Sequence, residues 1–282
     1  MAEAGPAPSH PELRAASSGA YLRLRRLFDP AGQTAVVVPL DQGIEGDFPE
    51  LERAPELVAE LVDAGATAFI MRRGMARQTA ASFAGRAGLI ERVTTRSRLA
   101  GRDDEPFLAS TPAGVLLDGA DAAVFTLFVG PLEDRQLQSF GLFADGCRAA
   151  GLPLVGEPFP GGLPGVAPYD GPFEVDDLRT AVRVACEEGA DIVKTAWSGS
   201  EASFRRVVAY STVPVILAGG PRTDDPAAIL GMIKGAMDAG ARGTAVGRKI
   251  WQWPDPPAML HAVARIVREG ADVDAALTAL HP

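Results

Sequence analysis

The sequence predicts an α/β fold, a (β/α)8 TIM barrel with an additional N-terminal helix. Two observations lead to this prediction. A helix that ends in glycine and passes directly into a short strand of Val, Ile and Phe recurs along the chain. Eight candidate strands alternate with eight candidate helices over roughly 250 residues, the length and order of a closed barrel. The alternative, a doubly wound open sheet, is disfavoured because no G-x-G-x-x-G motif follows the first strand.

Glycine-ended helices mark five of the strands. Each glycine suits the left-handed conformation that ends a helix, and the apolar run after it suits a strand buried on both faces. The joints lie at Gly65, Gly119, Gly151, Gly189 and Gly240. They predict strands at 66–71, 120–128, 152–159, 190–197 and 241–247, and further apolar runs predict strands at 34–40, 88–95 and 213–220.

The segments between these strands are the predicted helices. They cover residues 49–65, 73–85, 111–119, 132–151, 176–189, 201–211, 225–240 and 256–270. Ahead of the first strand, residues 11–28 have helical spacing of apolar residues and predict a lid helix. Residues 1–10 are rich in Pro, Ala and Ser and predict a disordered tail. We therefore expect one barrel domain over residues 11–282, in which residues 97–110 show no clear period.

Composition excludes several classes of function. A net charge of −9 disfavours a nucleic-acid partner. The two cysteines, Cys147 and Cys186, lack Cys or His partners at metal-ligand spacing, so neither a disulfide framework nor a zinc site is indicated. The chain starts without a signal-peptide pattern and contains no apolar run of about 18 residues, the length that spans a bilayer. These features predict a cytoplasmic protein without a membrane partner.

Lys194 is the most informative candidate for catalysis. It follows Asp191-Ile192-Val193 inside an apolar strand, where burial disfavours a charged ammonium. The chain uses 24 arginines and only three lysines, so a position that needs only a positive charge would more often hold arginine. An amine that loses its proton and attacks a carbonyl must be lysine. The alternative is a structural lysine whose head pairs with Asp41 or Glu157.

Other candidates follow from the rule that barrel enzymes carry their chemistry where strands end. Asp41 and Glu157 end two strands and are candidate acid–base groups, although a carboxylate that only caps a loop fits the pattern equally. We expect Glu45 and Asp47 to be solvated loop charges. The three histidines, His10, His261 and His281, lie in terminal segments or the last helix, which disfavours Ser-His-Asp, Cys-His and histidine-metal sites.

A second constellation suits phosphate. Gly219 and Gly220 end one strand, and Gly247 and Arg248 end the next, where backbone N–H groups of TIM barrels commonly hold phosphate. Arg248 can add a bidentate contact. The alternative is that these residues only form turns. Lys249 is a possible anion contact. Trp197 and Ser198, which follow Lys194, are further candidates for substrate or phosphate binding.

With these residues, the chain resembles the archaeal-type (DhnA-type) class I fructose-bisphosphate aldolase family of Schiff-base aldolases. The likeness runs from about residue 34 to 252. It is carried by VVVPLDQGIEGDFPE (36–50), GADAAVFTLFVGPLED (119–134), GLPLV (151–155), GADIVKTAWSGS (189–200), VPVILAGGP (213–221) and GARGTAVGRKIWQ (240–252). The family fold is a (β/α)8 barrel, and its members cleave or form a C–C bond beside the ketone of a phosphorylated sugar without a metal.

The resemblance implies roles for individual residues. The Schiff-base lysine falls on Lys194 and the aspartate that follows the first strand falls on Asp41. The phosphate-binding residues of the last two strands fall on Gly219, Gly220, Gly247 and Arg248. Neither cofactor nor metal is implied, and the expected partners are a small phosphorylated sugar or ketone and further copies of the chain in a homo-oligomer.

One departure from the family pattern matters. The family commonly ends its fifth strand in W-x-Y-P-R-G, whose tyrosine transfers protons, but this chain has Phe159 there. Phenylalanine cannot relay a proton, so Glu157 or Tyr169 is expected to replace it. A glutamate near this place resembles the tagatose-bisphosphate aldolase branch, which favours Glu157.

Three functions follow from these features. The first is a class I aldolase in which Lys194 forms a protonated imine, Glu157 takes the proton of the departing hydroxyl and Asp41 hydrogen-bonds substrate hydroxyls. The second is an imine-forming transferase or synthase, similar to aminoheptulosonate synthases or to the thiolase branch. The third is a phosphate-ligand binding barrel without catalysis, suggested by Phe159.

Overall fold

The computed structural model describes residues 15, 17–31, 33–99, 107–131, 134–161, 173–220 and 223–280. Its parallel strands close into a ring in the order β1-β10-β9-β8-β7-β6-β3-β2. They are β1 (Ala35–Pro39), β2 (Ala68–Met71), β3 (Gly88–Arg92), β6 (Ala122–Val129), β7 (Leu154–Pro160), β8 (Ile192–Thr195), β9 (Val215–Ala218) and β10 (Gly243–Ala245). The closed ring confirms the predicted barrel and excludes the open sheet.

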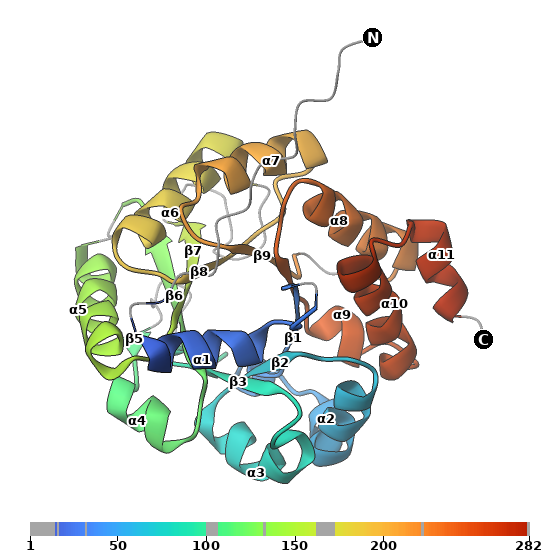
Figure 1. The fold of residues 1–282 in the computed structure, drawn as a ribbon, viewed down its shortest axis with the longest axis horizontal. Helices are drawn as coiled ribbons and strands as arrows, with labels where there is room; N and C mark the ends of the chain where they lie inside the picture. The colour runs from blue at the N-terminus through green and yellow to red at the C-terminus, as the bar shows by residue number, and fades with distance from the viewer. Residues whose placement is uncertain are drawn as a thin grey trace.

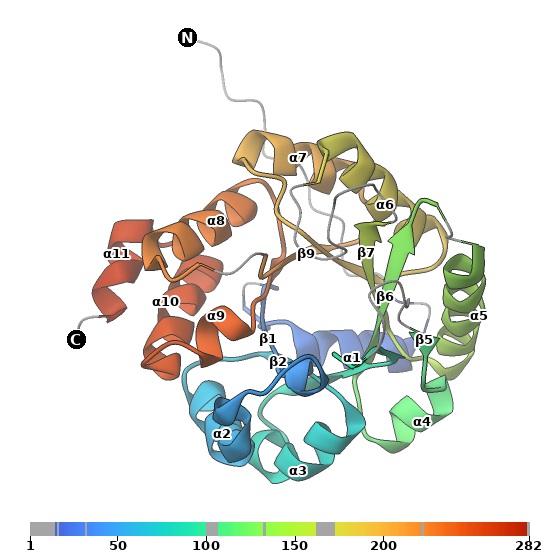
Figure 2. The same cartoon turned by 180° about the vertical axis from the view of Figure 1, so that it is seen from behind.

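Helices surround the barrel on its outside (Figures 1 and 2). Those predicted from the sequence are α2 (Ala54–Asp63), α3 (Arg73–Phe83), α4 (Pro112–Leu117), α5 (Asp134–Ala150), α6 (Val175–Glu187), α7 (Glu201–Tyr210), α8 (Pro226–Asp238) and α10 (Pro256–Glu269). The sequence analysis did not predict the short helices α9 (Arg248–Trp251) and α11 (Val273–Leu277), or the 3-10 turns η1 (Gln42–Ile44) and η3 (Thr278–Leu280). The predicted helix 49–65 begins as a 3-10 turn, η2 (Pro49–Arg53), before α2.

The glycines at the helix–strand joints adopt the predicted conformation. Gly65, Gly119, Gly151, Gly189 and Gly240 have φ values of 111°, 79°, 63°, 104° and 104°. These values lie in the left-handed region, which is open to glycine at little cost. Each joint therefore ends its helix abruptly and returns the chain to the barrel.

The predicted strand 88–95 divides in two. Its first part is β3, and the chain then leaves the ring to form β4 (Thr94–Thr95), which pairs antiparallel with β5 (Phe107–Leu108). The side chain of Thr94 turns back to the barrel, where its Oγ1 accepts a hydrogen bond from the Thr126 backbone N–H at 3.2 Å. A side-chain oxygen thus takes over the pairing of β6 where the strand beside it ends.

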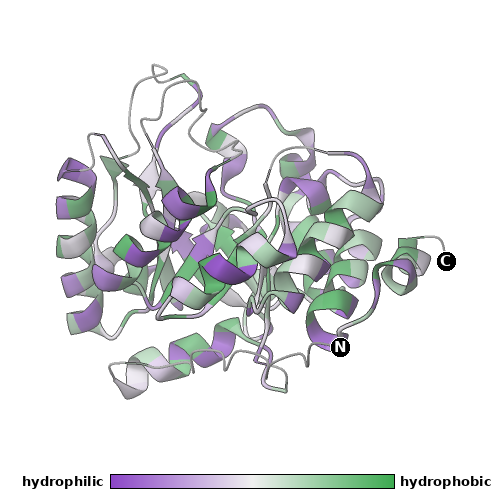
Figure 3. Cartoon of the chain, turned by 90° about the horizontal axis from the view of Figure 1, so that it is seen from above, coloured by the Kyte–Doolittle hydropathy of each residue, from purple (hydrophilic) through white to green (hydrophobic). Residues whose placement is uncertain are grey.

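The predicted N-terminal helix closes one end of the barrel. Helix α1 (Ser18–Leu27) begins at Ser17, whose side chain accepts a hydrogen bond from the Ala20 backbone N–H. Leu24 and Leu27 of α1 are fully buried and join the apolar cluster inside the barrel. Figure 3 shows this helix across the end of the barrel opposite the loops that follow the strands. The predicted disordered tail, residues 1–10, lies outside the described residues.

The strands therefore bury two cores. The inner one fills the barrel and includes Val37, Ile70, Ile90 and Ile216, and the outer one lies between strands and helices. Among the described residues, none of the helices has both the length and the apolar character that crossing a membrane requires.

The packing of α1 against the end of the barrel predicts how substitutions in this helix change the free energy of unfolding. Leu24→Ala removes a side chain that is 0% exposed and leaves a cavity inside the barrel, so we expect the free energy of unfolding to fall by about 3 kcal/mol. Leu22→Ala, on the same helix but 58% exposed, is the control and should change it by about 0.5 kcal/mol or less. Urea denaturation of both variants measures the difference. Equal losses in the two variants would show that α1 does not seal the barrel.

Candidate active site

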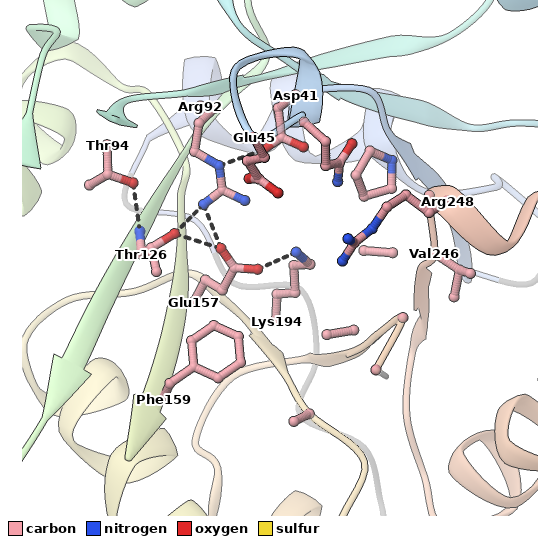
Figure 4. Close-up of a pocket in the computed structure, with 18 of the residues that line it drawn as sticks. Asp41, Glu45, Arg92, Thr94, Thr126, Glu157, Phe159, Lys194, Val246 and Arg248 are labelled. Atoms are coloured by element: carbon pink, nitrogen blue, oxygen red, sulfur yellow. Dashed lines mark hydrogen bonds and ion pairs between the residues drawn. The ribbon is translucent and has the colours of Figure 1, made fainter. Parts of the chain in front are cut away.

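A cavity of about 330 Å³ lies at the carboxyl ends of the barrel strands, on the side away from α1. Lys194, Glu157 and Asp41, the three predicted catalytic residues, all line it. Figure 4 shows their side chains converging from β8, β7 and the end of β1. The barrel thus brings together residues that lie up to 153 positions apart in the sequence.

The charged side chains of the cavity continue the inner layer of the barrel. Side chains of a strand alternate between its faces, so residues two apart point the same way. In three strands an apolar interior residue is followed two positions later by a charged one: Ile90 by Arg92, Val155 by Glu157 and Ile192 by Lys194. The apolar layer inside the barrel is therefore followed, toward the cavity, by a charged one.

Lys194 is held at the wall by Glu157. The lysine is 7% exposed and the glutamate 5%, and Nζ of Lys194 donates a hydrogen bond to Oε1 of Glu157. The other carboxylate oxygen, Oε2, accepts hydrogen bonds from Thr126 Oγ1 at 2.7 Å and from the Arg92 guanidinium. Both oxygens of Glu157 are thus occupied by neighbouring side chains.

Arg92 binds two carboxylates at once. Its side chain is 7% exposed; Nε donates to Oδ2 of Asp41 at 2.7 Å, and Nη1 donates to Glu157. Burial alone would raise the pKa of Glu157, but the charges of Arg92 and Lys194 outweigh it and lower that pKa to about 2. In turn, the two carboxylates raise the pKa of Arg92 against the effect of its own burial. Glu157 and Arg92 are therefore both charged at neutral pH.

Asp41 has one oxygen that no described group binds. The side chain is 4% exposed and lines the cavity, and Arg92 occupies Oδ2. Oδ1 is buried and has no hydrogen-bond partner among the described residues. A buried carboxylate oxygen without a donor is costly, so a hydroxyl that reaches Oδ1 is favoured as its partner.

Another part of the cavity wall is built from glycines and cations. Gly219, Gly220, Gly247, Arg248 and Lys249 all line it, at the ends of β9 and β10. A Cβ at Gly247 would lie 2.5 Å from the Pro39 carbonyl oxygen, so only glycine lets this loop pass so close to β1. Partial burial and the charge of Arg248 lower the pKa of Lys249. Exposed backbone beside these cations suits an anionic group.

The family model for DeoC/LacD aldolases matches residues 35–253, which span all eight barrel strands and the cavity. The chain belongs to the DeoC/LacD aldolase family. An uncharacterised aldolase of Saccharolobus solfataricus is 31% identical over 277 residues, covering 93% of this chain and 99% of that protein. A 2-amino-4,5-dihydroxy-6-oxo-7-(phosphonooxy)heptanoate synthase of Streptomyces griseus is 31% identical over 257 residues, covering 90% and 92%.

Solved structures of aldolases share the fold of this aldolase. An archaeal fructose 1,6-bisphosphate aldolase superposes with a TM-score of 0.79 at 26% identity, covering 89% of this chain and 100% of that chain. An archaeal fructose-1,6-bisphosphate aldolase whose catalytic lysine is covalently bound to a carbinolamine intermediate gives the same TM-score and identity, with coverage of 88% and 99%. The family and these structures identify a class I, Schiff-base aldolase and agree with the resemblance seen in the sequence.

Two predicted substrate contacts lie away from the cavity. Trp197 packs against Phe204 of α7, with ring centroids 5.2 Å apart, and against Gly235 of α8. Ser198 forms a hydrogen bond with Ser203 of α7 at 2.8 Å. Neither lines the described cavity. Both residues instead contact the helices behind the strand that carries the lysine, and their role in substrate binding stays a prediction.

Two further residues from the sequence analysis line the cavity, and a third falls outside the described chain. Glu45 is exposed, as expected of a loop charge, and also lines the cavity, where desolvation and the charge of Asp41 raise its pKa. Phe159 also lines the cavity and packs against Phe173, with ring centroids 6.0 Å apart. Tyr169, the alternative proton-transfer group, lies outside the described residues.

Sequence reasoning missed Arg92, Thr126 and Arg72. All three line the cavity, and each lies two residues beyond an interior apolar residue: Ile90, Val124 and Ile70. This spacing identifies such residues only where the inward-facing residue of the strand is known, and consecutive apolar residues such as Leu89 and Ile90 leave that open. Arg72 donates to the Asp41 and Thr94 carbonyl oxygens and so fixes the loop after β1.

The low pKa of Glu157 predicts a pH-dependent contribution to stability. Its carboxylate is favoured in the folded state above its ordinary pKa of 4.5, and this stabilisation is lost as the pH falls toward the folded pKa of about 2. We expect the free-energy difference between wild type and Glu157→Gln to be constant above about pH 5 and to shrink by about 1.4 kcal/mol per unit below it.

Urea denaturation of the two proteins between about pH 6 and pH 3 measures this difference. Glu52→Gln is the matched control, because Glu52 is exposed and already solvated by water. A difference between wild type and Glu157→Gln that stays constant down to about pH 3 would contradict the low pKa.

Proposed function

We propose that this aldolase cleaves or forms a C–C bond beside the ketone of a phosphorylated sugar or ketone phosphate, through an imine on Lys194. The observation that carries the proposal is the buried Lys194 amine, which lies in the cavity against Glu157 and shares the cavity with the glycine- and cation-lined ends of β9 and β10. A lysine placed only to balance charge would not need a cavity in front of its amine.

The reaction uses the amine as a nucleophile. Neutral Lys194 attacks the ketone carbon, the carbinolamine loses water, and the resulting protonated imine accepts the electron pair of the adjacent C–C bond as that bond breaks. An aldehyde leaves, the enamine takes up a proton, and hydrolysis of the imine releases the ketone phosphate. Because the imine is the electron sink, the chemistry requires no metal. Glu157 contacts the amine and is the nearest acceptor for its proton.

The charge of the cavity supports an anionic substrate. Among the described residues that line it, Asp41, Glu45 and Glu157 are outnumbered by cations. The cations are Arg72, Arg92, Arg96, Lys194, Arg248 and Lys249. The chain as a whole carries −9, so the positive potential is local to the mouth, where it attracts and orients an anion.

A synthase that joins a ketone phosphate to a second aldehyde is the other candidate. Two observations favour it: Phe159 replaces the tyrosine of the fructose-bisphosphate aldolase pattern, and the Streptomyces griseus relative is named for a phosphorylated keto amino acid. The imine on Lys194 is common to both functions. A product assay with and without an added aldehyde separates them, since only the synthase needs the second substrate. The assembled charge cluster argues against a barrel that only binds.

A cytoplasmic location and a homo-oligomer are parts of the same proposal. Cys147 and Cys186 are both free thiols, which suits a reducing compartment. We expect gel filtration to show an assembly larger than the 29.4 kDa chain, as is common in the family that the sequence resembles.

Borohydride trapping tests the imine. Incubation with dihydroxyacetone phosphate, reduction and peptide mass spectrometry should find a stable adduct on Lys194. Lys194→Arg keeps the positive charge beside Glu157 but cannot form the imine, so it should give no adduct and lose at least about 1,000-fold in kcat. Lys234→Met removes a surface lysine that pairs with Asp238 and should give the wild-type adduct. A folded wild type that binds the ligand but gives no adduct on Lys194 would refute the proposal.

Substitution of Arg248 tests where the phosphate of the substrate binds. Its charge is exposed at the cavity, so Arg248→Gln should raise the KM for a ketone phosphate about tenfold or more while changing kcat little. The unphosphorylated ketone is the matched control, and its weaker turnover should be the same in both proteins. An equal rise in KM for both ketones would place the phosphate elsewhere.

A further inference from the structure

Arg92 is the charged group that joins the two carboxylates of the site. It comes from β3, and Figure 4 shows it between Asp41 and Glu157. Its Nε contacts Asp41, and its Nη1 contacts both Glu157 and Thr126. Its contacts reach Asp41 after β1, Thr126 of β6 and Glu157 of β7, so its removal affects both carboxylates at once.

Glu157 and Asp41 differ in how many of their carboxylate oxygens have hydrogen-bond partners. Both oxygens of Glu157 already accept hydrogen bonds, Oε1 from Lys194 and Oε2 from Arg92 and Thr126. Asp41 gives only Oδ2 to Arg92, and its Oδ1 has no hydrogen-bond partner among the described residues. Of the two carboxylates, Asp41 is therefore the one with an oxygen, Oδ1, that lacks a partner among the described residues.

Arg92 also makes it possible for both carboxylates to be charged. Two carboxylates that share a buried site oppose each other's ionisation unless a cation lies between them. A lysine here would place a single point charge, whereas the guanidinium presents separate N–H groups to the two acids. The side chain is 7% exposed, so water screens these interactions little.

We propose that Arg92 is a positioning residue that divides the work of the two carboxylates: it holds Glu157 ionised against the Lys194 amine and sets Asp41 Oδ1 to take the substrate's proton. This inference rests on the proposed aldolase function. In the cleavage step the O–H proton of the β-hydroxyl moves to Asp41 Oδ1. The O–H electrons form the new C=O bond, and the C–C electrons move into the protonated imine to give the enamine.

The experiment compares the pH profiles of kcat for wild type, Arg92→Ala and Arg92→Lys. In parallel, borohydride trapping with dihydroxyacetone phosphate measures the adduct on Lys194 in each protein. Loss of Arg92 removes a charge that lowers the pKa of Glu157, so the acid limb of the Arg92→Ala profile should move to higher pH. We expect kcat to fall about 100-fold or more. Added guanidinium, which fits the vacated space, should restore part of the activity and move the acid limb back.

Arg92→Lys keeps one positive charge, so its acid limb should stay near that of wild type while kcat falls. Besides Arg92, Lys194 and Asp41, the charged groups that line the same cavity as Glu157 are Glu45, Arg72, Arg96, Arg248 and Lys249. None of them changes in these variants. Arg26→Ala removes an arginine that pairs with Asp121 at the other end of the barrel, and guanidinium should not affect its kcat.

Asp41→Asn separates the roles of the carboxylates. It should keep the borohydride adduct on Lys194 and lose kcat for C–C cleavage, whereas Glu157→Gln should slow adduct formation itself. An unshifted pH profile without guanidinium rescue in folded Arg92→Ala would overturn the role of Arg92. So would an Asp41→Asn protein with wild-type kcat. Failure of the wild type to form any adduct would instead refute the proposed function, so the two failures are distinguishable.

Discussion

A lysine amine inside a barrel of Val and Ile needs a counter-charge, and Glu157 supplies it. Burial of a single charge costs several kcal/mol, so the carboxylate of Glu157 is stable there because Lys194 and Arg92 both contact it. The other charged side chains of the site also need partners. Asp41 adds a second negative charge, and Arg92 lies between the two acids. Lys194, Glu157, Arg92 and Asp41 thus form a row in which each charged side chain contacts one of opposite sign.

The barrel makes this alternation possible. Its strands present every second residue to the interior, and α1 fills the opposite end with Leu24 and Leu27. The layer below the charged cluster is therefore apolar and dry, which strengthens the ion pairs above it. The chemistry lies where this dry layer meets the open mouth. There the amine is buried enough to be paired and near enough to the cavity to meet a substrate.

The sequence was most informative where local chemistry decides structure. Glycines such as Gly65 and Gly189 marked helix ends because few other residues adopt that conformation, and Lys194 was recognisable because an apolar strand seldom contains lysine. Arg92 was missed for a reason of register. In the run Glu91-Arg92 either residue can face inward, and only the closure of the barrel sends Arg92 to the cavity and Glu91 toward Ser110. The surroundings of Trp197 likewise depend on α7 and α8, which lie later in the chain.

Phe159 and Glu157 are best understood together. A phenol that transfers protons is uncharged and needs no counter-ion, whereas Glu157, two residues before Phe159, adds a buried negative charge to a site that already holds Asp41. Lys194 alone cannot neutralise two carboxylates, so the site needs a further buried cation. Arg92 is that cation, and Thr126 donates a further hydrogen bond to Oε2 of Glu157. The buried charge of Glu157 on β7 therefore depends on a residue of a different strand, Arg92 of β3.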